Sequence, residues 1–362
     1  MHPLMIGTAA FLAGVMTSRI APRRPATRNR SGPAAQDREV LTDTMVSGGG
    51  APVWLYCFEP AGLNLADIHF ELAETRPVED LLTAADPDVL PAPAQEMIAD
   101  IHAQRQALDS PDTAQWNGST VSIEGVQVSR SPHGPTQLSV CAGRSDYASH
   151  LATMSSWRAA RAAGPIGPDQ LEPLVRVVPG MINAAGLSVA VVTSDGFLVL
   201  ARNDPLHTGR DGLHVSVGEG MVPTDRATGA HLSVHLGMSR GIEEELGVYV
   251  APSDIVVHSA YLELTNYHFG TVGLADLHGT PLDRNAFVAA HLEARDGAEN
   301  LELVFVPWTP AVMLDRLCDP GWINDSTCWT AIALCAMFAF PSHRQDLGEM
   351  LVGDPLHEQE AA

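Results

Sequence analysis

A run of nine residues two thirds of the way along the chain, RGIEEELGV from Arg240 to Val248, constrains the fold more than any other segment. Residues three and four apart share one face of a helix, so Glu244 and Glu245 lie on the same face as position 241, one turn after Arg240. An arginine at that spacing can hold a carboxylate through charge-assisted hydrogen bonds. Crowded carboxylates repel one another unless a cation lies among them, which is typical of a Mg²⁺ or Mn²⁺ site. A solvated helix face is the alternative interpretation of the same run.

The segments around this helix predict a definite order of elements. An apolar strand at 186–193, a tight turn and a return strand at 197–201 precede a short strand at 213–217 and the loop Gly218-Glu219-Gly220. The helix then ends at Gly247, a residue suited to the left-handed conformation after a helix. Further strands are expected at 255–265, 268–276 and 301–306, with a last helix at 325–338.

The nine-residue run resembles the end of the Nudix signature, which it matches at eight of nine places. The resemblance implies an α+β chain with a Nudix-fold α/β/α sandwich over about 170–341. The chain departs from the signature in three ways. Gly241 replaces a glutamate expected to bind metal, Leu232 stands where another glutamate is expected, and an insertion around 223–230 separates the helix from the upstream glycine.

The region before this domain resembles the Nudix proteins that include the eukaryotic UDP-glucose and UDP-galactose pyrophosphatase. The similarity is carried by residues 53–74, 115–118 and 137–153, with Ser145-Asp146-Tyr147 as its most specific piece. An amphipathic helix at 94–108 and a hairpin at 119–129 and 136–141 predict a small N-terminal α+β domain over 51–165. We expect a disordered leader over 1–50 and a flexible acidic tail over 342–362. Ordered structure is expected to begin near Val53.

The resemblance implies a Mg²⁺- or Mn²⁺-dependent hydrolase that cleaves the diphosphate of a nucleoside-diphosphate-linked substrate. A UDP-sugar would give UMP and a sugar 1-phosphate. The alternative is a Nudix-fold module that binds a nucleotide as a sensor without efficient cleavage. The expected catalytic residues are Arg240, Glu244, Glu245 and Glu299, with metal held by Glu244, Glu245 and Glu219. The expected substrate-binding residues are Arg202, Gly218, Gly220 and Tyr147, although Tyr147 could instead anchor the N-terminal unit.

The amino-acid composition argues against several classes of partner and chemistry. A formal net charge of −22 argues against nucleic acid as a partner. The chain has no lysine, which excludes Schiff-base and P-loop chemistry. The five scattered cysteines favour reduced thiols and a cytoplasmic location. The apolar run Leu4 to Met16 is too short to span a bilayer, so no membrane partner is expected. Nothing in the sequence indicates an oligomeric state.

Gly241 also gives a testable expectation. Replacing it with glutamate would restore a carboxylate on the metal-binding face and, in an ordinary helix, would stabilise the helix by roughly 0.5–1 kcal/mol. Misfolding would instead mean that a neighbouring group already fills that space.

Overall fold

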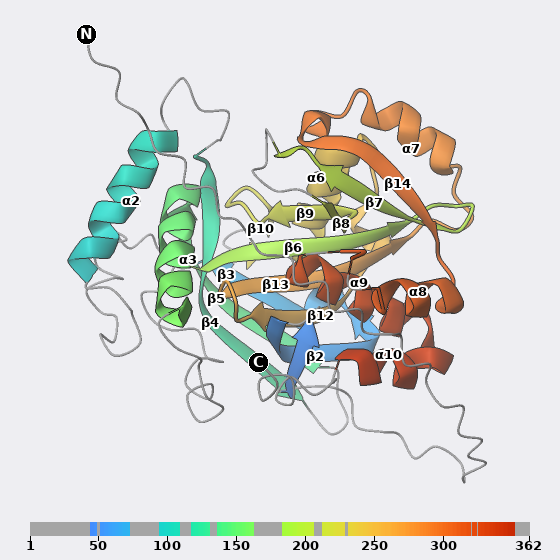
Figure 1. The fold of residues 1–362 in the computed structure, drawn as a ribbon, viewed down its shortest axis with the longest axis horizontal. Coiled ribbons are helices and arrows are strands. Elements are labelled where there is room, and N and C mark those ends of the chain that lie inside the picture. The colour runs from blue at the N-terminus through green and yellow to red at the C-terminus, as the bar shows by residue number, and fades with distance from the viewer. Residues whose placement is uncertain are drawn as a thin grey trace. The chain divides into compact units, whose positions relative to one another are not determined.

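A computed structural model describes residues 44–48, 51–72, 94–108, 117–130, 136–162, 183–205, 212–228, 231–319, 321–323 and 325–351. These residues form an α+β fold, which confirms the predicted class (Figure 1). The strands are β1 (Thr44–Gly48), β2 (Ala51–Leu63), β3 (Ile68–Leu72), β4 (Ser119–Arg130), β5 (Thr136–Asp146), β6 (Asn183–Val192), β7 (Phe197–Asn203), β8 (Leu213–Val215), β9 (Val217–Gly220), β10 (Arg226–Thr228), β11 (His231–Leu232), β12 (Ile255–Glu263), β13 (His268–Asp276) and β14 (Asn300–Pro307). The helices are α2 (Ala94–Leu108), α3 (Tyr147–Ala162), α6 (Val234–Leu246), α7 (Arg284–His291), α8 (Pro310–Leu317), α9 (Ser326–Ala339) and α10 (Arg344–Leu351).

Strand β6 explains why helices cover both faces of the sheet. It is buried along its whole length, and it pairs in parallel with β13 and antiparallel with β7 and β9. Leu187 and Val189 belong to one apolar cluster with Ile242 of α6, whereas Ala190 and Val192 belong to a second cluster with residues of α9. Because side chains alternate along a strand, a strand that is apolar throughout needs cover on both sides. Helices α6 and α9 therefore enclose the sheet in the α/β/α layering that the Nudix resemblance implies.

The signature helix α6 is fixed by a cap at each end. The hydroxyl of Ser233 accepts a hydrogen bond from the backbone N–H of Leu236 at 3.3 Å. At the other end Gly247 adopts a φ of 71°, and its N–H donates to the carbonyl of Glu243 at 3.1 Å. A left-handed residue in this position costs little only for glycine. The predicted helix end at Gly247 is confirmed.

Strands from the N-terminal region continue the sheet rather than forming an unconnected one. Strand β2 pairs antiparallel with β12, and β4 pairs antiparallel with β5 and with the start of β6, where Ser122 lies opposite Ala184. Strand β3 adds in parallel to β5. The domain boundary expected between 165 and 170 stays a prediction, and residues 163–182 lie outside the described residues.

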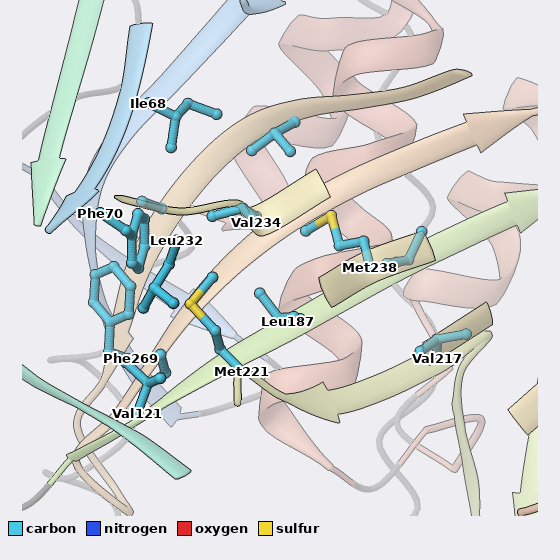
Figure 2. Close-up of a cluster of buried hydrophobic side chains, with 14 of the residues drawn as sticks. Ile68, Phe70, Val121, Leu187, Val217, Met221, Leu232, Val234, Met238 and Phe269 are labelled. Carbon is cyan, nitrogen blue, oxygen red and sulfur yellow. The ribbon is translucent and has the colours of Figure 1, made fainter. Parts of the chain in front are cut away.

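The insertion in the signature adds strands to the N-terminal part of the sheet. Strands β10 and β11 pair with each other, and β11 pairs with β3, so that Leu232 lies opposite Phe70. Figure 2 shows Leu232, Phe70, Met221 and Leu187 within one buried apolar cluster. A glutamate at position 232 would place a carboxylate in that cluster, which explains why the chain has leucine there.

The structure corrects the expected limits of order at both ends. Strand β1 lies inside the predicted disordered leader, pairs with β2 and buries Val46. Helix α10 lies inside the predicted flexible tail and buries Leu347 and Leu351. Both predictions failed because a five-residue strand and an eight-residue helix carry weak local signals and gain their stability from packing. Residues 1–43 and 352–362 lie outside the described residues.

Two further expectations concern membranes and thiols. Across the described part of the chain, every helix is too short or too polar to cross a membrane. All five cysteines fall within the described residues, and none takes part in a disulfide.

Candidate functional site

Arg240 of α6 is the centre of a mostly buried charged group. Its Nε lies 2.9 Å from Oδ1 of Asp225, and its Nη2 lies 3.2 Å from Oδ2 of the same carboxylate. Nη2 also donates to the carbonyl of Gly220 at 2.8 Å, and Nη1 donates to Oε2 of Glu244 at 2.7 Å. The predicted contact between Arg240 and Glu244 at i, i+4 spacing is therefore present, and a two-pronged contact with Asp225 is added to it.

Asp225 comes from the inserted segment, and no motif links it to the signature helix. Its side chain is 4% exposed. Burial disfavours the charged form of Arg240, but Asp225, Glu219 and Glu244 outweigh burial and raise the pKa of the guanidinium above its ordinary value. Arg240 thus stays charged and is fully engaged by protein groups. It is placed to orient carboxylates rather than to reach a substrate.

Glu245 is the most perturbed carboxylate of the group. Its residue is 7% exposed. Burial raises the pKa of Glu245 well above its usual range, and the charges of Glu219 and Glu299 raise it further, against the backbone N–H of Gly218 and the Asn300 amide. A carboxylate in this environment is strongly stabilised by a nearby positive charge.

Glu219 and Glu299 reach Glu245 from two other elements. Glu219 lies in β9, and its Oε1 accepts the N–H of Gly220 at 2.7 Å. Glu299 precedes β14 and is exposed. Burial raises the pKa of Glu219, and Glu244 and Glu299 raise it further, whereas Arg240 and Gly220 act in the opposite direction. The carboxylates expected at the site thus come from α6, β9 and the segment before β14, and they repel one another.

Glu244 is held by two arginines. Oε2 accepts from Arg240, and Oε1 lies 2.5 Å from Nη1 of Arg295. The loop that carries Arg295 is tied to α6, because the N–H of Asp296 donates to the carbonyl of Glu244 at 2.9 Å. The sequence reasoning missed Arg295, since no motif links position 295 to the signature helix.

Asn300 and His214 complete the buried wall beside Glu245. Nε2 of His214 lies 2.9 Å from Oδ1 of Asn300, and both side chains are buried. In the sequence His214 lies outside any metal-ligand spacing. Its contact with Asn300 makes it a structural support for the amide that faces Glu245.

The donor chemistry of the group suits a hard divalent cation. The carboxylates of Glu219, Asp225 and Glu244 contact Arg240, and Glu244 also contacts Arg295, while the charges of Glu245 and Glu299 act on the same group. Oxygen donors with excess negative charge are what Mg²⁺ prefers. Within the described residues, however, no three His, Cys, Asp or Glu side chains converge as a ready set of metal ligands. Both oxygens of Glu244 are engaged by arginine, so metal binding requires that at least one of them be released.

Two predicted substrate-binding residues lie in other surroundings. Arg202 pairs with Glu302 at 2.7 Å and lines a cavity of about 360 Å³ together with Arg316 and Trp322. Tyr147 begins α3, and its ring centroid lies 6.2 Å from that of His150. Their roles stay predictions. Gly218 and Gly220, by contrast, lie beside the carboxylates through their backbone groups.

The expectation that glutamate at position 241 would simply stabilise the helix is wrong. A Cβ added to Gly241 would lie 2.7 Å from Cγ1 of Val217 and 3.1 Å from Cβ of Glu219. A side chain at position 241 therefore requires the side chains of Val217 and Glu219 to shift. The second outcome considered from the sequence, an already filled space, is the one that the structure shows.

Comparison with known proteins finds distant matches among solved structures, two of which are described below. No protein-family profile matches the chain, and no curated protein matches it. Among solved structures, DR0079 from Deinococcus radiodurans aligns with a TM-score of 0.29 and 16% identity over 41% of this chain and 80% of that one. A MutT/nudix family protein from Enterococcus faecalis aligns with a TM-score of 0.25 and 14% identity over 34% of this chain and 43% of that one. The chain thus spans less than half the length of the second protein.

Proposed function

We propose that the chain is a Nudix-type hydrolase that cleaves the diphosphate of a nucleoside-diphosphate-linked substrate. The observation that carries the proposal is the Arg240–Glu244 pair of α6, together with Asp225 and Glu219, which contact the same guanidinium group. Such a group destabilises the folded protein, because like charges in a poorly solvated place repel one another. A bound divalent cation would offset this repulsion.

The cation would be held by Glu219, Glu244 and Glu245. When bound, a divalent cation polarises the phosphoryl oxygens and offsets the charge that develops on them during attack by water. The protein itself supplies the orientation. Arg240 fixes the carboxylate of Glu244 at 2.7 Å. Gly218 and Asn300 lie beside Glu245 and partly counter the rise in its pKa that burial causes.

In this proposal Glu299 would take a proton from the attacking water. It is exposed, so a proton accepted at its carboxylate can return to solvent. The water oxygen forms a new bond to phosphorus while the bridging oxygen–phosphorus bond breaks and the second phosphate departs. With a UDP-sugar the products are UMP and a sugar 1-phosphate, as the resemblance implies. A cytoplasmic location and a nucleotide-linked small molecule as the substrate belong to the same proposal.

A panel of nucleoside diphosphate sugars tests this proposal. Purified protein is incubated with each compound and either Mg²⁺ or Mn²⁺, and nucleoside monophosphate is measured by ion-exchange chromatography. Release of the monophosphate from at least one compound supports hydrolysis. No release from any of them, under conditions where a known Nudix enzyme is active, rejects it.

The second candidate function is a nucleotide sensor with the same fold. It is favoured by one observation, the engagement of both oxygens of Glu244 by Arg240 and Arg295, which holds a metal ligand away from metal. A nucleotide that raises the melting temperature without being cleaved would support the sensor, whereas turnover would reject it.

A further inference from the structure

A cavity of about 360 Å³ lies between the end of β7, the start of β8 and the segment that follows α8. Its lining includes two arginines, Arg202 and Arg316, together with Asp319 and Trp322. Cavities that bind small molecules have volumes from about 300 Å³ upward, so this one suits a compact ligand. The side chains around it indicate which kind of ligand that is.

The cavity lies on the face of the sheet that is opposite to α6. Leu200 of β7 belongs to the apolar cluster that includes residues of α9, whereas Val199 belongs to the cluster that includes residues of α6. Side chains alternate along a strand, so Arg202 lies on the same face as Leu200. Trp322 belongs to the α9 cluster as well. The cavity is therefore separate from the charged group of the proposed function.

Three side chains of the cavity keep N–H groups that the described part of the chain does not engage. Arg202 meets Glu302 through Nε at 2.7 Å, and its Nη1 and Nη2 have no hydrogen-bond partner among the described residues. The guanidinium of Arg316 is exposed and forms neither an ion pair nor a hydrogen bond with any residue that the structure describes. Trp322 is only 8% exposed, yet its indole N–H has no partner within the same residues.

These donors suit a phosphate group. Two guanidinium groups around one cavity repel each other unless an anion lies between them. Arginine presents its N–H groups in a planar fork that matches the oxygen atoms of a phosphate. A phosphate monoester carries about −1.5 to −2 charges at pH 7, which two arginines balance, whereas a carboxylate carries only one.

Asp319 indicates what the rest of the ligand carries. Its Oδ1 accepts the N–H of Gly321 at 3.0 Å, and its other oxygen has no hydrogen-bond partner among the described residues. An ionised carboxylate only accepts hydrogen bonds, so it repels phosphate and favours a hydroxyl group. We propose that this cavity binds a small phosphate monoester that carries hydroxyl groups. Its phosphate accepts hydrogen bonds from Arg202, Arg316 and Trp322, and one of its hydroxyl groups donates to Asp319. The inference adds a second ligand site to the proposed function and does not depend on it.

Isothermal titration calorimetry of the full-length protein tests this binding without any measurement of activity. The probes are glucose 1-phosphate, inorganic phosphate and glucose, each titrated in the presence of EDTA so that a divalent cation plays no part. The variants are Arg316→Gln and Asp319→Asn, with Arg284→Gln as the control. Arg284 is an exposed arginine of α7 that pairs with Asp195 at 2.7 Å, so its variant removes the same charge away from the cavity. Circular dichroism verifies that each variant is folded.

We expect the wild type to bind glucose 1-phosphate more tightly than inorganic phosphate, and not to bind glucose. Arg316→Gln should weaken binding of the ester by about tenfold or more, because charge-assisted hydrogen bonds to phosphate are lost, and Arg284→Gln should stay within about twofold of the wild type. Asp319→Asn should reduce the preference for the ester over inorganic phosphate by about threefold or more, because the carboxylate both repels phosphate and accepts from the hydroxyl group.

Three results would overturn the inference. The first is a wild-type protein that binds neither phosphate compound. The second is an Arg316→Gln protein that binds glucose 1-phosphate as tightly as the wild type, since binding would then lie elsewhere. The third is an unchanged preference for the ester in Asp319→Asn. None of these results bears on hydrolysis at α6, so the proposed function is tested separately.

Discussion

Arg295 and Glu244 are joined across 51 residues of sequence by a contact of 2.5 Å between Nη1 and Oε1. The two ends of the pair differ in environment, since the side chain of Arg295 is 74% exposed and that of Glu244 is 16% exposed. Arg240 holds the other oxygen of Glu244 and is mostly buried. Of the two arginines, Arg295 is therefore the one that can leave Glu244 at little cost.

If Arg295 competes with a cation for Glu244, then Arg295→Gln should strengthen Mg²⁺ binding. An exposed ion pair contributes about 0.2–1 kcal/mol, which corresponds to a gain in affinity of up to about fivefold. Isothermal titration calorimetry with Mg²⁺ measures the change. Arg284→Gln is the matched control, because Arg284 is also exposed and paired with a carboxylate, Asp195, at 2.7 Å. Weaker Mg²⁺ binding by Arg295→Gln alone would show that Arg295 supports the site instead of competing for it.

Arg240→Ala should destabilise the protein severely. The substitution leaves the buried carboxylate of Asp225 without its two-pronged partner, and breaking such a buried pair costs about 3–5 kcal/mol. Arg202→Ala removes an arginine from the exposed pair with Glu302 and should cost at most about 1 kcal/mol. Urea unfolding measures the free energy of unfolding of both variants. Equal losses of this free energy would contradict the importance of Arg240 for the stability of the fold.

Gly241→Ala and Gly348→Ala should have opposite effects on stability. Alanine at 241 meets Val217 at 2.7 Å, and overpacking of this kind costs about 1–3 kcal/mol. At Gly348 in α10 the nearest atom is a methionine methyl at 3.6 Å, so the helical preference of alanine should add about 0.5–1 kcal/mol to the free energy of unfolding. Thermal unfolding shows whether each variant is more or less stable than the wild type. A stabilised Gly241→Ala protein would refute the tight approach of α6 to β9.

His258 should make the protein less stable in mild acid. Its ring lies in the core, stacked on Phe338 with 4.8 Å between centroids, and burial lowers its pKa to about 3. The unfolded chain binds a proton at this histidine below about pH 6.5, whereas the folded protein does not, so the free energy of unfolding falls as the pH falls through that range.

The expected slope from His258 is about 1.4 kcal/mol per pH unit below pH 6.5. Urea unfolding of the wild type and of His258→Gln between pH 7.5 and 5.5 isolates the contribution of His258 to the pH dependence of stability, because other groups titrate alike in both proteins. The advantage of the wild type over the variant should shrink as the pH falls. Parallel curves would mean that His258 is protonated in the folded state.

The sequence predicted the parts of the site that depend on local spacing. The i, i+4 relation predicts the contact of Arg240 with Glu244, and glycine chemistry predicts the end of α6 at Gly247. Strand β13 was also predicted with the bounds that it has, His268–Asp276.

The remaining residues of the site depend on tertiary pairing that no short pattern records. Asp225 reaches Arg240 because the insertion folds into β10 and β11 and pairs with β3. Arg295 reaches Glu244 through a loop anchored by Asp296. The close contact at Gly241 depends on how β9 packs against α6, so it cannot be predicted from the sequence around Gly241.

The most direct measurement of the central claim compares the Mg²⁺-dependent release of nucleoside monophosphate by the wild type, Glu245→Gln and Glu243→Gln. Both variants lose one carboxylate from α6, but Glu245 is buried within the acidic group and Glu243 is exposed outside it. We predict that Glu245→Gln loses about a hundredfold or more of the rate, because a group that stabilises the transition state is gone. Glu243→Gln should keep a rate close to that of the wild type. Equal rates in the wild type and Glu245→Gln at every Mg²⁺ concentration would contradict the assignment of this group as a hydrolytic site.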